Sequence, residues 1–154
     1  MSGAGTTYDY DDRELQTLIK HTGDRIKNVQ PAMKEFGEYM VLTTADRFDD
    51  EEAPDGTPWK KLSPKTQKWK DDHNKIDKIL QQDGYLRLVY YRANKTGLSI
   101  WSNREYAAIH QFGGMAGRGQ KVEIPKREFL GFSDADKAEF VETVKDWLIL
   151  GINN

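Results

Sequence analysis

The 154-residue sequence contains no cysteine and no long run of apolar residues. The lack of thiols excludes a disulfide framework, a cysteine-ligated metal site and a thiol nucleophile, and it fits a reducing compartment. No apolar run approaches the roughly 18 residues of a membrane span. The first residues, 1–12, lack the basic start and the apolar centre of a signal peptide. The sequence therefore predicts no membrane segment and no disulfide-stabilised secreted domain.

An excess of one charge sign is also lacking. The 23 Lys and Arg residues nearly balance the 25 Asp and Glu residues, so the formal net charge is -2 with neutral histidines. The chain as a whole therefore lacks the net positive charge that is typical of nucleic-acid-binding domains. It does contain 4 Trp, 7 Tyr and 6 Phe, enough large apolar side chains to build one core. We expect residues 1–11 to form a flexible arm and residues 12–154 to form a single domain.

The N-terminal third of the chain has a helical pattern. Between Leu15 and Phe48 most apolar residues follow one another at steps of three, four or seven, and the opposite face is polar. Pro31 interrupts this stripe, and proline removes a backbone donor and clashes with the preceding turn. Residues 12–48 are therefore predicted to form one long kinked helix or two helices in series.

The second half of the chain has the pattern of strands and turns. Residues 86–93 and 98–102 are rich in β-forming side chains, and Asn94–Gly97 between them supplies a turn, so we predict a hairpin. The glycine-rich stretch 113–119 is interpreted as a mobile loop, and residues 121–124 alternate as a further strand.

A short helix is predicted over residues 105–112, ended by the glycines that follow it. His110 is expected to make structural hydrogen bonds rather than to act as a catalytic base. The other large side chains are expected to pin this helix to the sheet: Tyr106, Ile109 and Phe112.

Ser133 and Asp136 have the spacing of a capping box, and an amphipathic helix follows to about Leu150. The sequence thus predicts an α+β fold, in which the N-terminal helix, kinked or split at Pro31, and this C-terminal helix pack on a small, mainly antiparallel sheet. The residues expected to be mostly buried are Phe36, Met40, Leu88, Tyr90, Ile100, Val141, Val144 and Leu148.

Two oppositely charged blocks adjoin in the centre of the chain. Residues 46–55 contain six acidic residues and one arginine, a net charge of -5, and residues 56–78 contain seven lysines and three aspartates, a net charge of +4. Within the basic block we predict a helix over about residues 64–72, with Ser63 as its N-cap and Pro64 in its first turn. Such segregated charge is suited to steering the association of subunits.

No constellation of reactive side chains stands out. His21, His73 and His110 are far apart in sequence, and no second ligand lies at metal-binding spacing. The sequence has no nucleophile elbow, and its glycine-rich stretch lacks the Gly-Lys-Ser/Thr of a phosphate-binding loop. We therefore expect no enzyme activity, no cofactor, no metal and no small-molecule substrate.

The lysine-rich block leaves one alternative open. Its lysines could neutralise phosphates while Trp59 and Trp69 stack on bases, as in a small nucleic-acid-binding module. Alternatively, the lysines form a solvated face and the tryptophans pack into a core or an interface. The adjoining acidic block favours this second interpretation because it repels phosphate.

The order of several segments resembles one known family. The chain contains, in sequence, the stretches Asp55–Pro64, Lys78–Arg87, Trp101–Asn103, Tyr106–Gly114 and Val122–Gly131. Together these stretches resemble the phage virion morphogenesis family, which includes the Mu-type G protein and P2-type tail completion proteins, and the resemblance covers about residues 12–150. The sequence departs from the pattern at Glu128, where proline is expected, and at Gly84-Tyr85, where Thr-Gly-Arg-like residues are expected.

The resemblance implies a non-enzymatic structural protein that acts in tail completion or head–tail joining, located in the virion after assembly in the host cytoplasm. Related neck and tail-completion proteins are α+β domains that assemble as rings, often sixfold. The implied partners are copies of this chain and other phage head–tail or tail-tube proteins, with non-specific contact to packaged DNA as a further option. The alternative is a transient capsid-assembly factor that is absent from the mature particle.

On this interpretation two sets of charged residues are candidates for subunit or partner contacts. In the first set, an acidic patch on one subunit faces a basic patch on its neighbour, and the residues are Asp49, Asp50, Glu51, Glu52, Lys60, Lys61, Lys65 and Lys68. The second set lies in and after the glycine-rich stretch and consists of Arg118, Lys121, Lys126 and Arg127.

Overall fold

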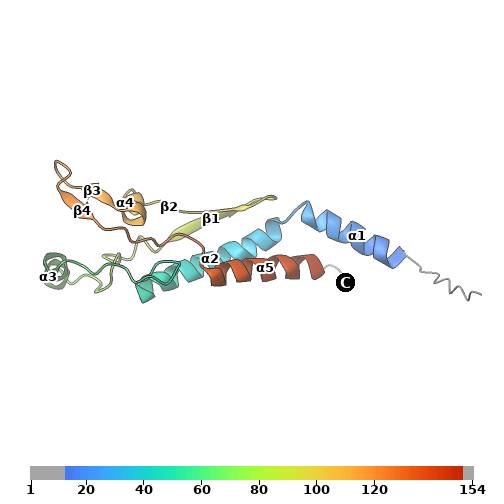
Figure 1. Cartoon of the computed structure of the whole chain (residues 1–154), viewed down its shortest axis with the longest axis horizontal. Coiled ribbons are helices and arrows are strands. Elements are labelled where there is room, and N and C mark those ends of the chain that lie inside the picture. The colour runs from blue at the N-terminus through green and yellow to red at the C-terminus, as the bar shows by residue number, and fades with distance from the viewer. Residues whose placement is uncertain (1–12, 151–154) are drawn as a thin grey trace, which may run out of the picture.

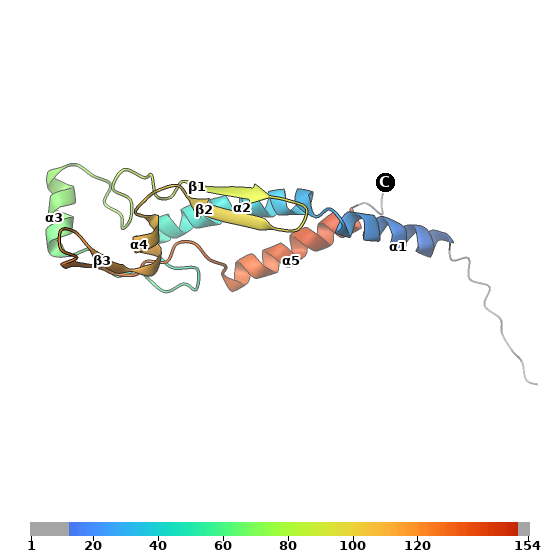
Figure 2. The same ribbon diagram turned by 90° about the horizontal axis from the view of Figure 1, so that it is seen from above.

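The computed structural model describes residues 13–150, so the predicted flexible arm lies outside the described residues. The described chain is elongated, with three helices along its long axis and the hairpins over one side of them (Figures 1 and 2). The elements are α1 Arg13–Ile26, α2 Gln30–Asp50, α3 Pro64–Asp72, β1 Val89–Ala93, β2 Leu98–Ser102, α4 Ala107–Phe112, β3 Gly114–Ala116, β4 Val122–Ile124 and α5 Asp134–Ile149. Two antiparallel pairs, β1–β2 and β3–β4, complete the predicted α+β fold.

The N-terminal helical segment is split rather than kinked. α1 ends at Ile26 and α2 begins at Gln30 with Pro31 in its first turn. A proline is tolerated there because the N–H it lacks would have no partner within the helix. Pro31 therefore starts a second helix, and α1 and α2 follow each other along the long axis (Figure 1).

The β1–β2 hairpin has the predicted turn and packs on α2 (Figure 1). The inward residues of β1 are Val89, which is buried, and Tyr91 and Ala93, which are half-buried. The Tyr91 ring covers the helix backbone at Gly37 so closely that an added methyl group would overlap it. The strand therefore lies directly on the helix at this point.

The predicted buried face of β1 is wrong by one residue. Leu88 and Tyr90 are exposed, because Val89 and Tyr91 point toward α2. Successive side chains of a strand point to opposite faces, so a shift of one position exchanges the inner and outer sets.

The predicted core residues Phe36 and Met40 are buried on α2. The Phe36 ring stacks with Phe132 at a centroid separation of 6.2 Å and meets Phe140 of α5 edge-on at 5.1 Å. Ile100, also predicted to be mostly buried, is half-buried in β2. These contacts connect α2 to both the hairpin and the C-terminal helix.

A buried ion pair between Arg47 of α2 and Asp136 of α5 joins the two helices. Arg47 Nη1 also donates hydrogen bonds to the Phe129 carbonyl at 3.1 Å and the Gly131 carbonyl at 3.0 Å. Asp136 completes the predicted capping box with Ser133. One carboxylate thus starts a helix and neutralises a buried guanidinium.

This ion pair explains why the predicted face of α5 is wrong in part. Val141, expected to be buried, is exposed, and Val144 and Leu148 are only half-buried. Asp136 takes the buried position because its ion pair sets which face of α5 meets α2. The apolar stripe of the helix is therefore rotated partly toward solvent.

A second apolar cluster lies near the C-terminal end of α2. Phe48 and Phe129 are fully buried with ring centroids 5.4 Å apart, and Trp59 meets Phe48 edge-on at 5.3 Å. Ile79, Leu86 and Val89 complete the cluster. The long connection between α2 and β1 is thereby gathered onto the end of the helix, and it carries α3, whose predicted N-cap Ser63 accepts a hydrogen bond from Thr66 N at 3.2 Å.

Part of the glycine-rich stretch is a strand, which corrects the prediction of a loop. Gly114–Ala116 forms β3 and pairs with β4, and residues 117–120 form the turn between them. Gly113 ends α4 with φ 73°, and a β-carbon at this position would lie 2.9 Å from Lys126 N. Glycine is required here because both the backbone angle and the space exclude other residues.

The predicted attachment of α4 by its large side chains is wrong. Tyr106 is exposed, Ile109 is half-buried, and Phe112 is 74% exposed. The helix is instead attached through Gln111, whose amide donates to the Leu130 carbonyl at 2.7 Å and accepts from Leu130 N at 3.0 Å. Hydrogen bonds from a polar side chain therefore attach α4, where apolar packing was predicted.

Candidate functional site

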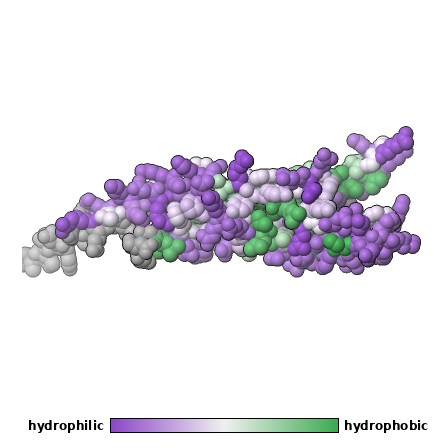
Figure 3. Space-filling model, turned by 180° about the vertical axis from the view of Figure 1, so that it is seen from behind, coloured by the Kyte–Doolittle hydropathy of each residue, from purple (hydrophilic) through white to green (hydrophobic). Residues whose placement is uncertain are grey.

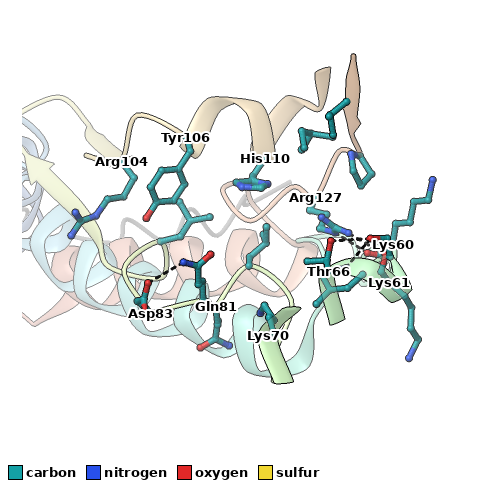
Figure 4. A pocket seen from close by; sticks show the side chains of 18 of the residues that line it. Lys60, Lys61, Thr66, Lys70, Gln81, Asp83, Arg104, Tyr106, His110 and Arg127 are labelled. Carbon is teal, nitrogen blue, oxygen red and sulfur yellow. Dashed lines mark hydrogen bonds between the residues drawn. The ribbon is translucent and has the colours of Figure 1, made fainter. Parts of the chain in front are cut away.

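A groove opens at the end of the molecule opposite α1, between the α3 segment and the part formed by α4 and the β3–β4 hairpin (Figures 1 and 4). Its volume is about 940 Å³. One wall comes from residues 60–70 and 80–86, and the other from residues 104–110 and 122–127. The groove is a large concave feature with several convergent polar side chains and is our candidate functional site.

Positive side chains outnumber negative ones in this groove. The cationic lining residues are Lys60, Lys61, Lys70, Arg104 and Arg127, and the acidic ones are Asp83 and Glu123. Asp83 is already paired with Lys75 at 2.7 Å, and this contact lowers the pKa of its carboxyl. The groove therefore has an excess of positive charge.

Two of the groove cations are buried against backbone carbonyls. Arg127 donates from Nε to the Lys60 carbonyl at 2.7 Å and from Nη2 to the Lys61 carbonyl at 3.2 Å. Lys70 Nζ donates to the Ile76 carbonyl at 2.9 Å. Neither cation has an ion pair with a carboxylate within residues 13–150, and burial lowers the pKa of both groups. These carbonyls orient the cations without cancelling their charge.

His110 lies between Tyr106 and Arg127 along the groove (Figure 4). The prediction that its side chain makes structural hydrogen bonds is wrong for Nδ1, which is buried and has no hydrogen-bond partner in the described part of the chain. The His110 carbonyl does accept a hydrogen bond from Arg127 N at 2.7 Å. Burial, and secondarily the nearby Arg127 charge, lower the pKa of His110. The ring is therefore a neutral group beside a cation.

Across the described residues, 13–150, no three metal-ligating side chains converge. At the end of α3, Asp72 pairs with Lys68 at 3.2 Å, while the His73 ring stacks on Trp69 at a centroid separation of 4.4 Å. With these contacts, residues 71–73 form an exposed helix end. Over the same residues, no helix combines the length and the apolar character needed to cross a bilayer.

The acidic part of the predicted interface is partly used inside the chain. Asp49 forms an ion pair with Arg87 at 3.0 Å, and the Glu51 carboxylate accepts a hydrogen bond from Ile79 N at 2.7 Å. Both contacts hold the connection before β1 against the end of α2. The other two members of the acidic set are at the surface: Asp50 is exposed and Glu52 is half-buried.

The basic part of the predicted interface divides into three places. Lys60 and Lys61 line the groove, whereas Lys65 and Lys68 are exposed on α3 outside it. Arg118 and Lys121 are exposed around the β3–β4 turn, and Lys126 pairs with Glu128 at 2.8 Å. Arg127 is buried, so it is an internal groove residue rather than part of an exposed patch. Contact of the remaining residues with a partner stays a prediction.

Apolar surface is also available for contact. A smaller pocket of about 270 Å³ lies between α2, β2 and residues 130–132, and the buried Thr44 Oγ1 in its lining has no hydrogen-bond partner within the described residues. Figure 3 shows apolar patches in the middle of the back face and on the projecting β3–β4 hairpin, where Met115 and Val122 are exposed. Large contiguous apolar patches are typical of surfaces that contact other proteins.

The comparison with protein families decides what kind of protein has this architecture. The model of the phage virion morphogenesis family matches residues 10–149. This chain belongs to that family. The resemblance inferred from the ordered segments is thereby confirmed, and the virion morphogenesis protein has a role in building phage particles.

A named relative supports the same assignment. The Mu-like prophage FluMu G protein 2 of Haemophilus influenzae is 28% identical to this chain over 138 residues, which cover 90% of this chain and 91% of the relative. No solved structure matches the chain. The arrangement of the groove therefore comes from the present structure alone.

Sequence analysis missed the groove of this virion morphogenesis protein. Arg104 lies over the ring of Tyr85 at 4.7 Å from the centroid, and both residues lie in connecting segments with no periodic pattern. The available signal was that Tyr106 and Arg127 lie within stretches that carry the family resemblance. Nothing local in the sequence shows that these stretches meet.

Proposed function

We propose that this chain is a structural subunit of the phage head–tail junction or tail end, where it acts in tail completion or head–tail joining as part of a ring of identical subunits. Family membership supports the morphogenesis role. The observation that carries the finer proposal is that the two ends of the elongated subunit differ. A basic groove lies at one end and α1 lies at the other, with the exposed Ile149 and Leu150 at the end of α5, which packs against α1.

Two different ends suit a heterologous contact, in which one surface of a subunit meets a different surface of the next. Contacts of this type close into rings when the rotation between neighbours allows it. Exposed apolar side chains on the β3–β4 hairpin supply further contact area for a head or tail protein. The proposed location is therefore the virion, with assembly in the host cytoplasm.

A catalytic role is not part of this proposal. His110 is the groove residue best suited to proton transfer, but its Nδ1 has no hydrogen-bond partner within residues 13–150. In a catalytic triad, a partner of this kind holds the histidine ring in position. A His110→Gln copy is therefore expected to support particle assembly as well as the unchanged chain.

A nucleic-acid-binding module has less support. Trp59 is 5% exposed and its indole donates to the Glu128 carbonyl at 2.9 Å, so it is not available to stack on a base. Trp69 already stacks on His73. The exposed lysines remain able to contact phosphates, which makes non-specific contact with packaged DNA a secondary property of a structural subunit.

The test is a nonsense mutation in this gene of the encoding phage, with a plasmid copy as the complementation control. We expect electron microscopy to show filled heads and separate tails, or tails with irregular ends, and complementation to restore infectious particles. Mass spectrometry of purified normal particles should detect the chain. Absence of the chain from these particles, together with malformed heads in the mutant, would favour the transient capsid-assembly factor instead.

A further inference from the structure

The positive groove is suited to an acidic, aromatic peptide. Cations stand at both ends of it, with Arg104 at one end and Arg127 at the other, and the rings of Tyr106 and His110 lie between them (Figure 4). Tyrosine rings offer apolar contact area at small conformational cost, and cations at the ends attract carboxylates.

The chain itself contains a segment of this chemistry. Residues 8–12 read Tyr-Asp-Tyr-Asp-Asp, so three carboxylates and two aromatic rings occur within five positions, and no lysine or arginine occurs before Arg13. In an extended peptide, alternate side chains point to opposite sides. This segment could therefore present tyrosines to the ring-lined wall while its aspartates face the cations.

A chain cannot place this segment in its own groove. α1 and α2 lie end to end between Arg13 and the groove (Figures 1 and 2), and their 14 and 21 residues span about 50 Å at 1.5 Å per residue. The 12 residues before Arg13 reach at most about 42 Å when fully extended. The groove lies beyond the far end of α2, so only a second molecule can supply the segment.

We propose that the groove binds residues 1–12 of a neighbouring copy of this chain, with Asp9 and Asp11 facing its cations and Tyr8 and Tyr10 against Tyr106 and His110, while Asp12 adds to the negative charge of the segment. This contact is heterologous, because the N-terminal segment of one subunit occupies the opposite end of the next. The inference rests on the proposed function only in that both require copies to associate.

The composition of the groove favours a peptide over DNA. Glu123 lies in the same lining and would repel a phosphate backbone, whereas a short peptide can place its carboxylates away from it. A DNA duplex carries one charge per about 1.7 Å along its whole length, so its phosphates cannot be spaced to avoid this group.

The experiment measures fluorescence anisotropy of a labelled synthetic peptide of residues 1–12 with the full-length protein. We expect saturable binding, and about tenfold weaker binding for a peptide with Asp9→Asn, Asp11→Asn and Asp12→Asn. No saturable binding of the unchanged peptide up to about 1 mM protein, or equal binding of both peptides, would overturn the proposal.

Two double variants of the protein locate the binding site. Lys60→Glu with Lys61→Glu changes lysines that line the groove, and Lys65→Glu with Lys68→Glu makes the same charge change on exposed positions of α3 outside it. We expect about tenfold weaker peptide binding for the first pair and less than about threefold for the second. Equal loss in both would assign the binding to general charge and overturn the groove assignment. Circular dichroism checks that both variants are folded.

A mixing experiment shows whether the contact joins copies. A protein with Asp9→Lys, Asp11→Lys and Asp12→Lys is mixed with the Lys60→Glu, Lys61→Glu protein, and association is followed by native mass spectrometry. We expect each protein alone to associate more weakly than the unchanged chain and the mixture to regain association, and no gain on mixing counts against the proposal.

A labelled DNA duplex tests the competing ligand, and DNA binding that depends on Lys60 and Lys61 without any peptide binding would replace the proposal. Failure here leaves the phage phenotype of the proposed function unaffected.

Discussion

Arg47 and Arg127 are equally buried, at 6% exposure each, but their surroundings compensate their charges differently. Arg47, between α2 and α5, has the Asp136 carboxylate and two backbone carbonyls. Arg127, beside the groove, has the carbonyls of Lys60 and Lys61 and no ion pair with a carboxylate in the described part of the chain. The first guanidinium is neutralised and the second is only oriented.

The difference separates a structural region from an interaction region. A buried ion pair holds its elements in place because loss of one partner leaves an unpaired charge. A buried cation that contacts only carbonyls keeps a positive electrostatic potential in the groove. Such a potential is suited to binding an acidic partner. The charge balance of the α2–α5 region is therefore suited to holding the subunit together, and that of the groove is suited to the acidic partner that we propose.

Asp136→Ala is expected to have the largest effect. It leaves Arg47 buried without a counterion and removes the helix cap, so the free energy of unfolding should fall by about 3–5 kcal/mol. Asp134→Ala is the control, since Asp134 lies in the same first turn with a fully exposed side chain. Urea denaturation followed by circular dichroism measures both. Similar stability of the two variants would mean that the ion pair does not hold α5.

Gly37→Ala tests how tightly the structural region is packed. Alanine normally favours a helix over glycine, but here its methyl group would overlap the Tyr91 ring, so we expect destabilisation of about 1–3 kcal/mol. Gly23→Ala in α1 has no atom within 4 Å of its new methyl group and should stabilise by up to about 1 kcal/mol. Thermal unfolding of both variants checks the opposite signs, and a shared sign contradicts the close contact between α2 and β1.

Arg127→Met compares the two arginines directly. The substitution leaves carbonyls rather than a carboxylate without a partner, so we expect a loss of about 1–2 kcal/mol. The matching Arg47→Met variant should lose more, because it leaves Asp136 buried and unpaired. Urea midpoints of the two variants give the comparison. An equal loss would remove the distinction between the two regions.

The smallest expected effect is the pH dependence due to His110. Burial and the Arg127 charge hold the pKa of His110 below its ordinary value of 6.5. The unfolded chain therefore binds more protons below about pH 6.5, so stability is complete above that value and falls as the pH drops toward the folded-state pKa. Melting temperatures at pH 7.5 and pH 5 should differ less in His110→Gln than in the unchanged protein. An unaltered difference would mean that other groups cause the pH dependence.

Patterns that involve near neighbours predicted local structure well. Ser63 and Ser133 cap their helices as expected, Pro31 starts α2, and Asn94–Gly97 makes the hairpin turn. Each of these features depends on backbone angles and hydrogen bonds within a few residues, so the local residue types are enough to predict it. The family resemblance succeeded for a similar reason, because it used the order of short segments.

Contacts between distant segments were not predictable in this way. Whether Val89 or Leu88 points inward depends on where β1 meets α2, and a strand pattern with apolar residues on both faces does not decide it. Gln111 holds α4 through residue 130, and Arg127 joins the two walls of the groove through backbone carbonyls of residues 60 and 61. A backbone carbonyl has no signature in the sequence, so these partners were visible only in the fold.

The amino-acid sequence by itself determined the helices, the hairpin, the balance of charge and the family, because all of these follow from local propensity or the order of segments. Tertiary structure alone decided that Asp136 neutralises Arg47 and that Arg127 lacks such a partner. The physical reason is that the energetic contribution of a charged side chain depends on its burial and on the groups that contact it. Both are set by residues far away in the chain.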